Sequence, residues 1–246
     1  RPPRSTLFPY TTLFRSDDGV GQLLARLDAL GLRDNTLVLF TSDNGGTQQS
    51  SQEPLRGSKG GYYEGGIREP MLVRWPGMVR PGSACDTPVS NIDFFPTFLD
   101  AAGARPPQGK ILDGESIVPL LRGASGLKRQ SLFWHFPGYL NDPVIRGRDP
   151  VFRTRPVSVI RKGDFKLHLY HEEWQLDGGR EKLSTNRAVE LYNLRSDPGE
   201  RHDLALKLPA KRDELLHDLL AWQKSTNAPM PTQPNPAYKP HGPGTA

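Results

Sequence analysis

One apolar run places the strongest limit on how this chain can fold. Residues 36–41 read Thr-Leu-Val-Leu-Phe-Thr, without the polar alternation of a strand that has one face in water. An amphipathic helical pattern precedes this run, with Asp17 and Asp18 at its start and Gly31 at its end. A helix, a turn and a strand buried on both faces are typical of a mostly parallel α/β sheet.

The predicted strand leads directly into Asp43-Asn44-Gly45-Gly46. In open α/β sheets, functional sites lie at the carboxyl ends of the strands. A carboxylate beside an amide carbonyl supplies two hard oxygen ligands, which suit Ca²⁺ or Mg²⁺. The same residues also favour a plain turn. This motif alone therefore leaves a cation site and a turn as alternatives.

A second candidate motif is glycine-rich and basic. Residues 55–70 read Leu-Arg-Gly-Ser-Lys-Gly-Gly-Tyr-Tyr-Glu-Gly-Gly-Ile-Arg-Glu-Pro. The glycines permit close approach of an anion, and Lys59 supplies a positive charge for a sulfate or phosphate oxygen. The alternative is a solvated loop in which Lys59 has no functional role.

The character of the chain changes after residue 125. Short strand-like segments then follow at residues 131–136, 157–161, 165–170 and 189–192. We predict that residues 17–125 belong to a large α/β domain, and that residues 126–226 form a small antiparallel sheet with an amphipathic helix, residues 204–225, packed across it. The prolines of residues 227–246 predict an extended tail.

Charge and composition exclude several classes of protein. No apolar run approaches the ~20 residues that a membrane-spanning helix needs. The net charge is +5, but three arginines lie in residues 1–16, which contain no acid. Without them, 29 basic residues face 27 acidic ones, a net charge of +2, which does not indicate a nucleic-acid partner.

Residues 6–16 also resemble a sequencing adapter read as codons. We therefore interpret residues 1–16 as a non-native segment, and a genuine N-terminal strand is the alternative.

Several stretches in order resemble the sulfatase family of the alkaline-phosphatase-like superfamily. They are TLVLFTSDNGG, LRGSKGGYYEGGIREPMLVRWPG, SNIDFFPTFLDAAG, ILDGESIVPLL, IRKGDFKLHLY and ELYNLRSDPGERHDLA. The resemblance as a whole covers about residues 17–226. The resemblance implies the C-terminal part of an α/β/α sandwich with a mostly parallel sheet, followed by a small antiparallel-sheet subdomain that carries a C-terminal helix.

The resemblance also implies roles for particular residues. Asp43 and Asn44 match a pair of calcium ligands, with Ca²⁺ favoured over Mg²⁺, and Lys59 matches the lysine that contacts the substrate sulfate. His135 matches a histidine that lies near the substrate pocket of some sulfatases, and a hydrogen-bonded packing role is the alternative. Structural roles are expected for Glu64, Gly65, Gly66, Arg68 and Asp93.

The family's nucleophile is a formylglycine made from Cys or Ser in a C/S-x-P-x-R motif, and this sequence contains no such motif. Cys85 lies in Ser-Ala-Cys-Asp-Thr-Pro-Val, which does not fit it. The resemblance therefore places the nucleophile and a first aspartate pair in an upstream part of a longer protein. We expect no catalytic nucleophile in this chain, and no turnover by the chain alone.

The activity that the resemblance implies is hydrolysis of a sulfate ester, on a small molecule or a sulfated carbohydrate. It also implies a periplasmic or extracellular location. Two alternatives remain open at this point. One is a phosphodiesterase or phosphonate hydrolase of the same superfamily, and the other is a non-catalytic module that binds anionic sugars.

Overall fold

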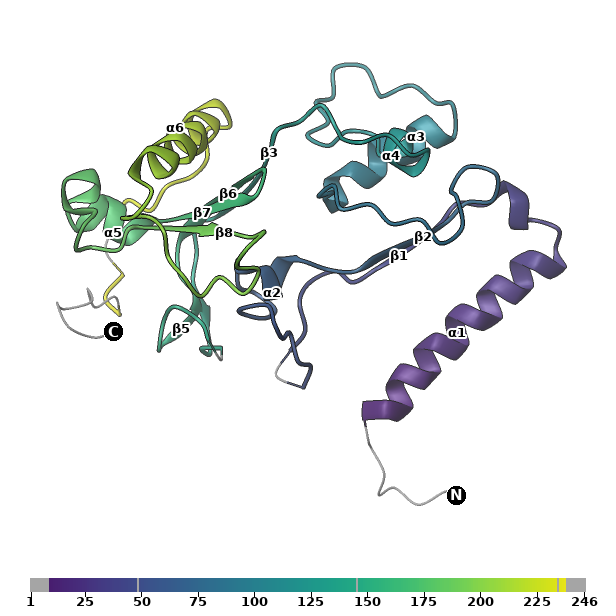
Figure 1. Cartoon of the computed structure of the whole chain (residues 1–246), viewed down its shortest axis with the longest axis horizontal. Coiled ribbons are helices and arrows are strands. Elements are labelled where there is room, and N and C mark those ends of the chain that lie inside the picture. The colour runs from purple at the N-terminus through teal and green to yellow at the C-terminus, as the bar shows by residue number, and fades with distance from the viewer. Residues whose placement is uncertain (1–8, 48, 145, 234, 238–246) are drawn as a thin grey trace. The chain divides into compact units, whose positions relative to one another are not determined.

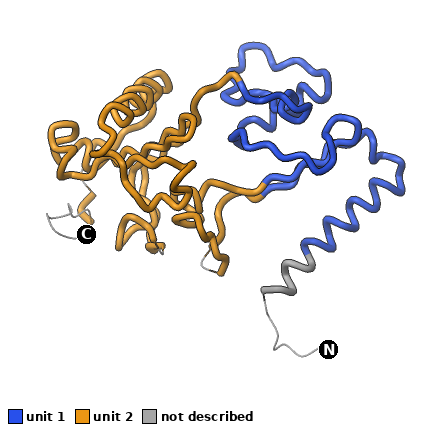
Figure 2. The backbone as a smooth tube through the Cα atoms, viewed as in Figure 1, with its two compact units in different colours: residues 1–41, 71–127 blue, residues 42–70, 128–246 orange. Residues whose placement is uncertain are grey.

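The computed structural model describes residues 9–47, 49–144, 146–233 and 235–237, without the side chains of residues 9–15. Figure 2 shows its two compact units. Unit 1 comprises residues 1–41 and 71–127, and unit 2 comprises residues 42–70 and 128–246. The boundary after residue 127 lies near the predicted change at residue 125, whereas residues 42–70 cluster with the second unit. No helix of the described residues is long and apolar enough to cross a membrane.

Unit 1 is built mainly from helices and one pair of strands (Figure 1). Its elements are α1 (Pro9–Ala29), η1 (Arg33–Asn35), β1 (Val38–Thr41), β2 (Met71–Arg74), η2 (Asn91–Asp93), α3 (Phe94–Ala101) and α4 (Val118–Leu121). Asp93 lies at the start of α3, where its carboxylate accepts a hydrogen bond from the backbone N–H of Ser90 at 2.8 Å. Ser90 and Asp93 form a reciprocal cap that fixes the beginning of η2, which leads directly into α3.

The first helix is longer than the sequence predicts. α1 begins at Pro9, so Asp17 and Asp18 lie within the helix and not at its start. Extending a helix adds one backbone hydrogen bond for each residue fixed, which costs far less than starting a helix. Residues 1–8, the first part of the segment interpreted as non-native, lie outside the described residues.

The strand pair of unit 1 departs from the expected parallel sheet. β1 and β2 pair antiparallel, with Phe40 opposite Leu72. Parallel pairing needs a crossover that returns the chain to the other end of the sheet, usually through a helix. Among the described residues of the connection 42–70, the only helix is the single turn α2 (Glu64–Ile67), which is too short for such a crossover. The strand is also not buried on both faces, because Phe40 is 52% exposed in this chain.

Unit 2 contains the larger sheet. Its strands are β3 (Ser131–Phe136), β6 (Val157–Lys162), β7 (Phe165–Tyr170) and β8 (Val189–Asn193), ordered β3-β6-β7-β8 and all antiparallel. β6 and β7 form a hairpin across Gly163, whose φ of +57° favours glycine. The shorter elements are β4 (Leu140–Asn141), β5 (Phe152–Thr154), α5 (His171–Leu176) and η3 (Gly179–Lys182). The C-terminal helix α6 (Pro209–Ser225) starts at a proline.

The two faces of this sheet have different chemistry because side chains alternate along a strand. On one face, Leu167 and Leu169 of β7 pack with Leu215 and Leu219 of α6, which lies along the sheet in Figure 1. The opposite face carries polar side chains of β7 and β8 that are buried as well, among them Lys166, His168, Tyr170, Glu190 and Tyr192. The second face therefore needs buried polar partners.

Deletion of residues 1–16 should change the stability of the chain little. The part of α1 whose side chains are described, residues 16–29, has no buried side chain. Because the remaining part of this helix buries no side chain, we expect removal of residues 1–16 to shift the melting temperature by less than about 2 °C. Thermal unfolding followed by circular dichroism measures this. A loss of several kcal/mol would show that residues 1–16 belong to the fold.

Candidate functional site

The structure brings the two candidate motifs together through their backbones. The N–H of Gly45 donates to the carbonyl of Gly66 at 3.1 Å, and the N–H of Lys59 donates to the carbonyl of Gly46 at 3.0 Å. The Asp43-Asn44 turn is thereby joined on both sides to residues 59–66. The Lys59 side chain and Asp43 are exposed, and Asn44 is half-buried. The convergence of these three side chains on one ligand stays a prediction.

Glycine is required where the two motifs meet. A Cβ atom at Gly65 would lie 2.6 Å from the carbonyl oxygens of both Arg56 and Gly57. A Cβ atom at Gly45 would overlap the carbonyl of Gly65. Gly65 also donates its N–H to Arg56 at 2.7 Å. The glycines thus let three backbone segments pack in direct contact.

A buried ionic network holds this glycine-rich segment on the polar face of the sheet. The ammonium of Lys166 lies 2.9 Å from a carboxylate oxygen of Glu64 and 3.0 Å from one of Glu200. Glu200 also accepts the N–H of Glu64 at 2.5 Å. Burial lowers the pKa of His168, which lies 3.2 Å from Glu200, so that imidazole is neutral near pH 7. Burial alone would raise the pKa of Glu200, but Lys166 and His168 hold it below its ordinary value.

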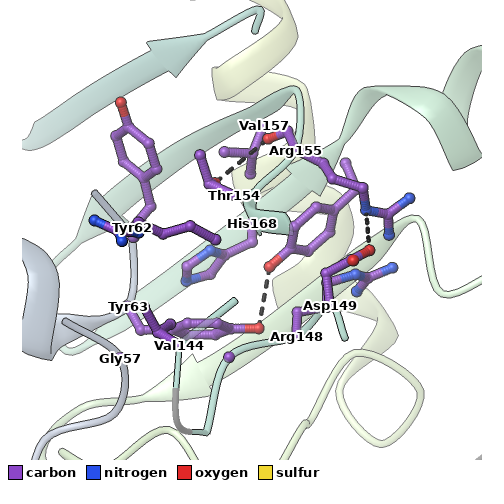
Figure 3. A pocket seen from close by; sticks show the side chains of 14 residues that line it. Gly57, Tyr62, Tyr63, Val144, Arg148, Asp149, Thr154, Arg155, Val157 and His168 are labelled. Carbon is purple, nitrogen blue, oxygen red and sulfur yellow. Dashed lines mark hydrogen bonds and ion pairs between the residues drawn. The ribbon is translucent and has the colours of Figure 1, made fainter. Parts of the chain in front are cut away.

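A second buried network lies beside the first, and three of its residues, Tyr63, Arg148 and Arg155, line a small cavity (Figure 3). Arg148 pairs with Glu190 at 2.6 Å and with Glu173 at 3.0 Å, and Glu173 also pairs with Arg155 at 2.6 Å. The hydroxyl of Tyr63 donates to Glu190 at 2.6 Å. The cavity measures about 20 Å³, which accommodates a single water molecule. It is too small for a substrate, so this cluster supports the motifs and does not bind a ligand of that size.

His135 makes two hydrogen bonds within the protein. Its Nδ1 lies 2.6 Å from the hydroxyl of Ser158, and its Nε2 lies 2.7 Å from the carbonyl oxygen of Pro229. Its ring also contacts that of His171, with centroids 5.5 Å apart. Burial, together with His135, lowers the pKa of His171 to about 4. These are the contacts that the packing alternative expects, and a place for His135 near the substrate pocket stays a prediction.

The residues around Asp43 suit a cation, although they do not complete a site. Oε1 of Glu69 is buried and has no hydrogen-bond partner among the residues described. Burial, and the charge of Asp43, raise the pKa of Glu69. Neighbouring carboxylates and the Asn44 carbonyl are hard donors of the kind that Ca²⁺ prefers. Within the described residues, no group of three or more His, Cys, Asp or Glu side chains could hold a metal. Further oxygen ligands would be needed to reach the usual six to eight.

Comparison with known proteins assigns the chain to a family. The profile described as "Sulfatase" matches residues 10–104, and that of the "N-sulphoglucosamine sulphohydrolase, C-terminal" region matches residues 58–221. The second match alone covers more than half of the chain. The chain therefore belongs to the sulfatase family.

Curated relatives match most of this chain but less than half of their own length. A "Sulfatase" of Formosa agariphila is 35% identical over 252 residues, covering 92% of this chain and 41% of the relative. "Arylsulfatase A" of Homo sapiens is 36% identical over 221 residues, covering 85% of this chain and 41% of the relative. The chain thus spans about two fifths of the length of these relatives.

Solved structures show the same fold. The crystal structure of "Ps i-CgsB" has a TM-score of 0.64 and 27% identity, covering 86% of this chain and 41% of that one. The structure of "BT4656 in complex with its substrate D-Glucosamine-2-N, 6-O-disulfate" has a TM-score of 0.66 and 25% identity, covering 90% and 41%. The mixed α/β architecture, with antiparallel sheets and a C-terminal helix, is that of the alkaline-phosphatase-like sulfatases. The predicted fold family is thereby confirmed, whereas the strand pair of unit 1 is antiparallel and not parallel as expected.

Sequence reasoning identified the two motifs but not the networks behind them. Lys166 and His168 alternate with leucines in β7, which is the pattern of a strand with one face in water. Their burial was therefore unexpected. A cation buried on one strand requires carboxylate partners elsewhere in the chain. The acids Glu64, Glu190 and Glu200 are such partners, and they were the one indication of these networks in the sequence.

Proposed function

We propose that this chain is part of a sulfuric ester hydrolase, in which Lys59 and the Asp43-Asn44 pair contribute to the site that binds the sulfate group. The observation that carries this proposal is the pair of backbone hydrogen bonds that join Gly45 and Gly46 to Gly66 and Lys59. They hold a candidate cation ligand and a candidate anion-binding lysine in one tightly packed loop pair. Relatives named as sulfatases support the same reaction.

The reaction converts R–O–SO₃⁻ and water into R–OH and hydrogen sulfate. The ammonium of Lys59 would bind a non-bridging sulfate oxygen and stabilise the negative charge that develops as the ester bond breaks. Asp43 and Asn44 would hold a Ca²⁺ ion, with Mg²⁺ less favoured, and this cation would neutralise charge on the sulfate oxygens when bound. The formylglycine nucleophile would come from another part of the protein, because the C/S-x-P-x-R motif is absent from this sequence.

A second candidate is hydrolysis of a phosphonate monoester. The "Phosphonate Monoester Hydrolase of Agrobacterium radiobacter" has a TM-score of 0.58 and 26% identity, covering 85% of this chain and 39% of that one. A lysine and a cation stabilise a phosphoryl oxygen by the same electrostatics as a sulfuryl oxygen. The choice between the two depends on the nucleophile, which this sequence does not contain.

Turnover of 4-nitrophenyl sulfate with calcium tests the proposal. We expect none from this chain alone, and turnover from a longer gene product that supplies the nucleophile motif. In that longer protein, Lys59→Ala should lower kcat/KM about 100-fold, because one electrostatic contact to the transition state is lost. Chelation of the calcium should also lower it.

The matched control is Lys207→Ala, which removes another exposed lysine of unit 2 and should leave kcat/KM unchanged. Turnover by the chain alone that is lost on Lys59→Ala would contradict the assignment of the nucleophile. Full activity of Lys59→Ala in the longer protein would contradict the role of Lys59. Faster hydrolysis of a phosphonate monoester than of the sulfate would favour the second candidate.

A further inference from the structure

Lys59 lies in a tight turn whose backbone directs its side chain. The N–H of Gly61 donates to the carbonyl of Ser58 at 2.9 Å, which closes a turn over residues 58–61. Gly60, the third residue of this turn, has a φ of +83°, whereas φ is not positive at Lys59. These features are typical of a type II turn. Among the described residues, the Lys59 side chain makes no hydrogen bond or ion pair, so its direction depends on the backbone of the turn.

The residues of the turn do not fix its conformation by themselves. The same hydrogen bond closes turns of type I and type II, which differ by a rotation of the central peptide plane of about 150–170°. Glycine at the third position is compatible with both orientations. A contact from outside the turn is therefore needed to hold the carbonyl of Lys59 in one of them.

Arg153 of β5 makes this contact. Its Nη1 donates to the carbonyl of Lys59 at 3.4 Å, and its Nε donates to the carbonyl of Asp142 at 3.3 Å. These hydrogen bonds are long, but the stem of the side chain also packs on the turn. A Cβ atom at Gly60 would lie 2.7 Å from Cδ of Arg153 and 3.1 Å from Cδ1 of Leu140. The two side chains thus close over Gly60 and restrict rotation of the adjoining peptide.

Ordered elements hold Arg153 and Leu140 in place. β4 and β5 pair antiparallel, with Leu140 opposite Thr154. Phe152 and Thr154, on either side of Arg153, are buried. The ring of Phe152 also contacts that of Tyr139, with centroids 5.0 Å apart. The contacts to the turn therefore come from a strand pair that is itself anchored.

Arg153 differs from the neighbouring arginines in its partners. Arg148 pairs with Glu190 and Arg155 pairs with Glu173, each at 2.6 Å. Within the part of the chain that the structure describes, Arg153 forms no such pair with a carboxylate, and both of its hydrogen bonds go to backbone carbonyls. A place in the buried ionic network therefore does not explain this side chain, whereas its contact with the turn does.

We propose that Arg153 is a positioning residue for Lys59. By holding the Lys59 carbonyl, it keeps residues 58–61 in the conformation from which the Lys59 side chain reaches the sulfate group. The inference rests on the proposed function, because it takes Lys59 as the sulfate anchor. Methionine at position 153 would fill the space over Gly60 without donating a hydrogen bond, and lysine would retain a charged donor.

Native-state amide hydrogen exchange of the full chain, followed by NMR, tests whether Arg153 holds the turn. In Arg153→Met, the amides of Lys59 and Gly61 should exchange about fivefold faster, because a hydrogen bond that restrains the turn is lost. Arg153→Lys should recover part of this protection. Amides of the β6–β7 hairpin should keep their rates, which excludes a general loss of stability.

The matched control is Arg212→Met. Arg212 is likewise half-buried and donates to a backbone carbonyl, that of Ala205 at 3.2 Å, but does not contact the turn. It should leave the exchange of Lys59 and Gly61 unchanged. Unaltered exchange of these amides in Arg153→Met, or equal acceleration in both variants, would overturn the inference.

Turnover of 4-nitrophenyl sulfate by the longer gene product separates this inference from the proposed function. Arg153→Met should lower kcat/KM about fivefold, but less than about twofold when Lys59→Ala is already present, because the effect acts through Lys59. A fivefold loss that persists in the Lys59→Ala background would overturn the positioning role. So would unchanged turnover in Arg153→Met beside a large loss in Lys59→Ala. Full activity of Lys59→Ala would instead overturn the proposed function, and the exchange rates would still decide whether Arg153 holds the turn.

Discussion

Replacing Gly65 with alanine should lower the free energy of unfolding of unit 2 by about 3 kcal/mol. The added Cβ atom would lie 2.6 Å from two backbone carbonyl oxygens, those of Arg56 and Gly57. Neither oxygen belongs to a flexible side chain that could move aside at small cost. The backbone would have to separate, and the 2.7 Å hydrogen bond from Gly65 to Arg56 would be strained or lost.

Urea unfolding followed by tryptophan fluorescence measures this change, since Trp134, Trp174 and Trp222 all lie in unit 2. The matched control is Gly126→Ala, because Gly126 is exposed and a Cβ atom there would meet nothing within 4 Å. The control should change stability by less than about 0.5 kcal/mol. A cost below about 1 kcal/mol for Gly65→Ala would show that the close backbone contact is not maintained in solution.

The apolar alternation of the C-terminal strands was enough to predict their sheet and its helix. In β7, Phe165, Leu167 and Leu169 share one face, and that face packs with α6. Period-two patterns and a hairpin turn are local signals, so they can be recognised without knowledge of the remaining structure. The helix starts at Pro209 and not at residue 204, because a proline is favoured in the first helical turn.

The apolar run of residues 36–41 was a poorer guide. It predicted a strand, and β1 is one, but it did not determine what covers the strand. Burial on both faces depends on neighbouring elements, and the direction of pairing depends on the connection to the next strand. Phe40 and Leu72, which lie opposite each other, are 52% and 66% exposed. The apolar pattern of residues 36–41 indicates neither what covers the strand nor the direction in which it pairs.

The candidate site shows the same division between local and distant signals. Glycine spacing in residues 45–66 identified two motifs whose backbones do meet. The carboxylates that hold the second motif could not be assigned to it, because their contacts cross long stretches of chain. The Lys166–Glu64 hydrogen bond joins residues 102 positions apart, and the Tyr63–Glu190 hydrogen bond joins residues 127 positions apart. Tyr63 and Glu64 belong to the segment around α2, whereas Glu190 and Lys166 belong to the sheet, so their pairing depends on how these distant parts of the chain pack.

Replacing Arg148 with methionine should lower the free energy of unfolding by about 3–5 kcal/mol at pH 7. The Arg148 side chain is 4% exposed and pairs with Glu173 and Glu190, each 2% exposed. Methionine fills much of the same space but leaves two buried carboxylates without this partner. The matched control is Arg195→Met, since Arg195 is 81% exposed and lies 3.6 Å from Asp164. This surface pair should contribute less than about 1 kcal/mol.

The pH dependence of unfolding separates this electrostatic role from lost packing. Burial alone would raise the pKa of Glu190, but Arg148 and the neighbouring hydrogen bonds lower it from 4.5 to about 2. This difference in pKa contributes about 3 kcal/mol to the free energy of unfolding. The contribution is fully present above pH 4.5 and is lost as the pH falls toward 2.

Without Arg148, the pKa of folded Glu190 should rise toward or above its unfolded value, because burial then dominates. The free energy of unfolding of Arg148→Met should therefore depend less steeply on pH between 4.5 and 2 than that of the unmodified chain. Urea titrations at several pH values measure both slopes. A variant that is destabilised equally at every pH would show that Arg148 acts through packing alone, and one no less stable than Arg195→Met would contradict the buried network itself.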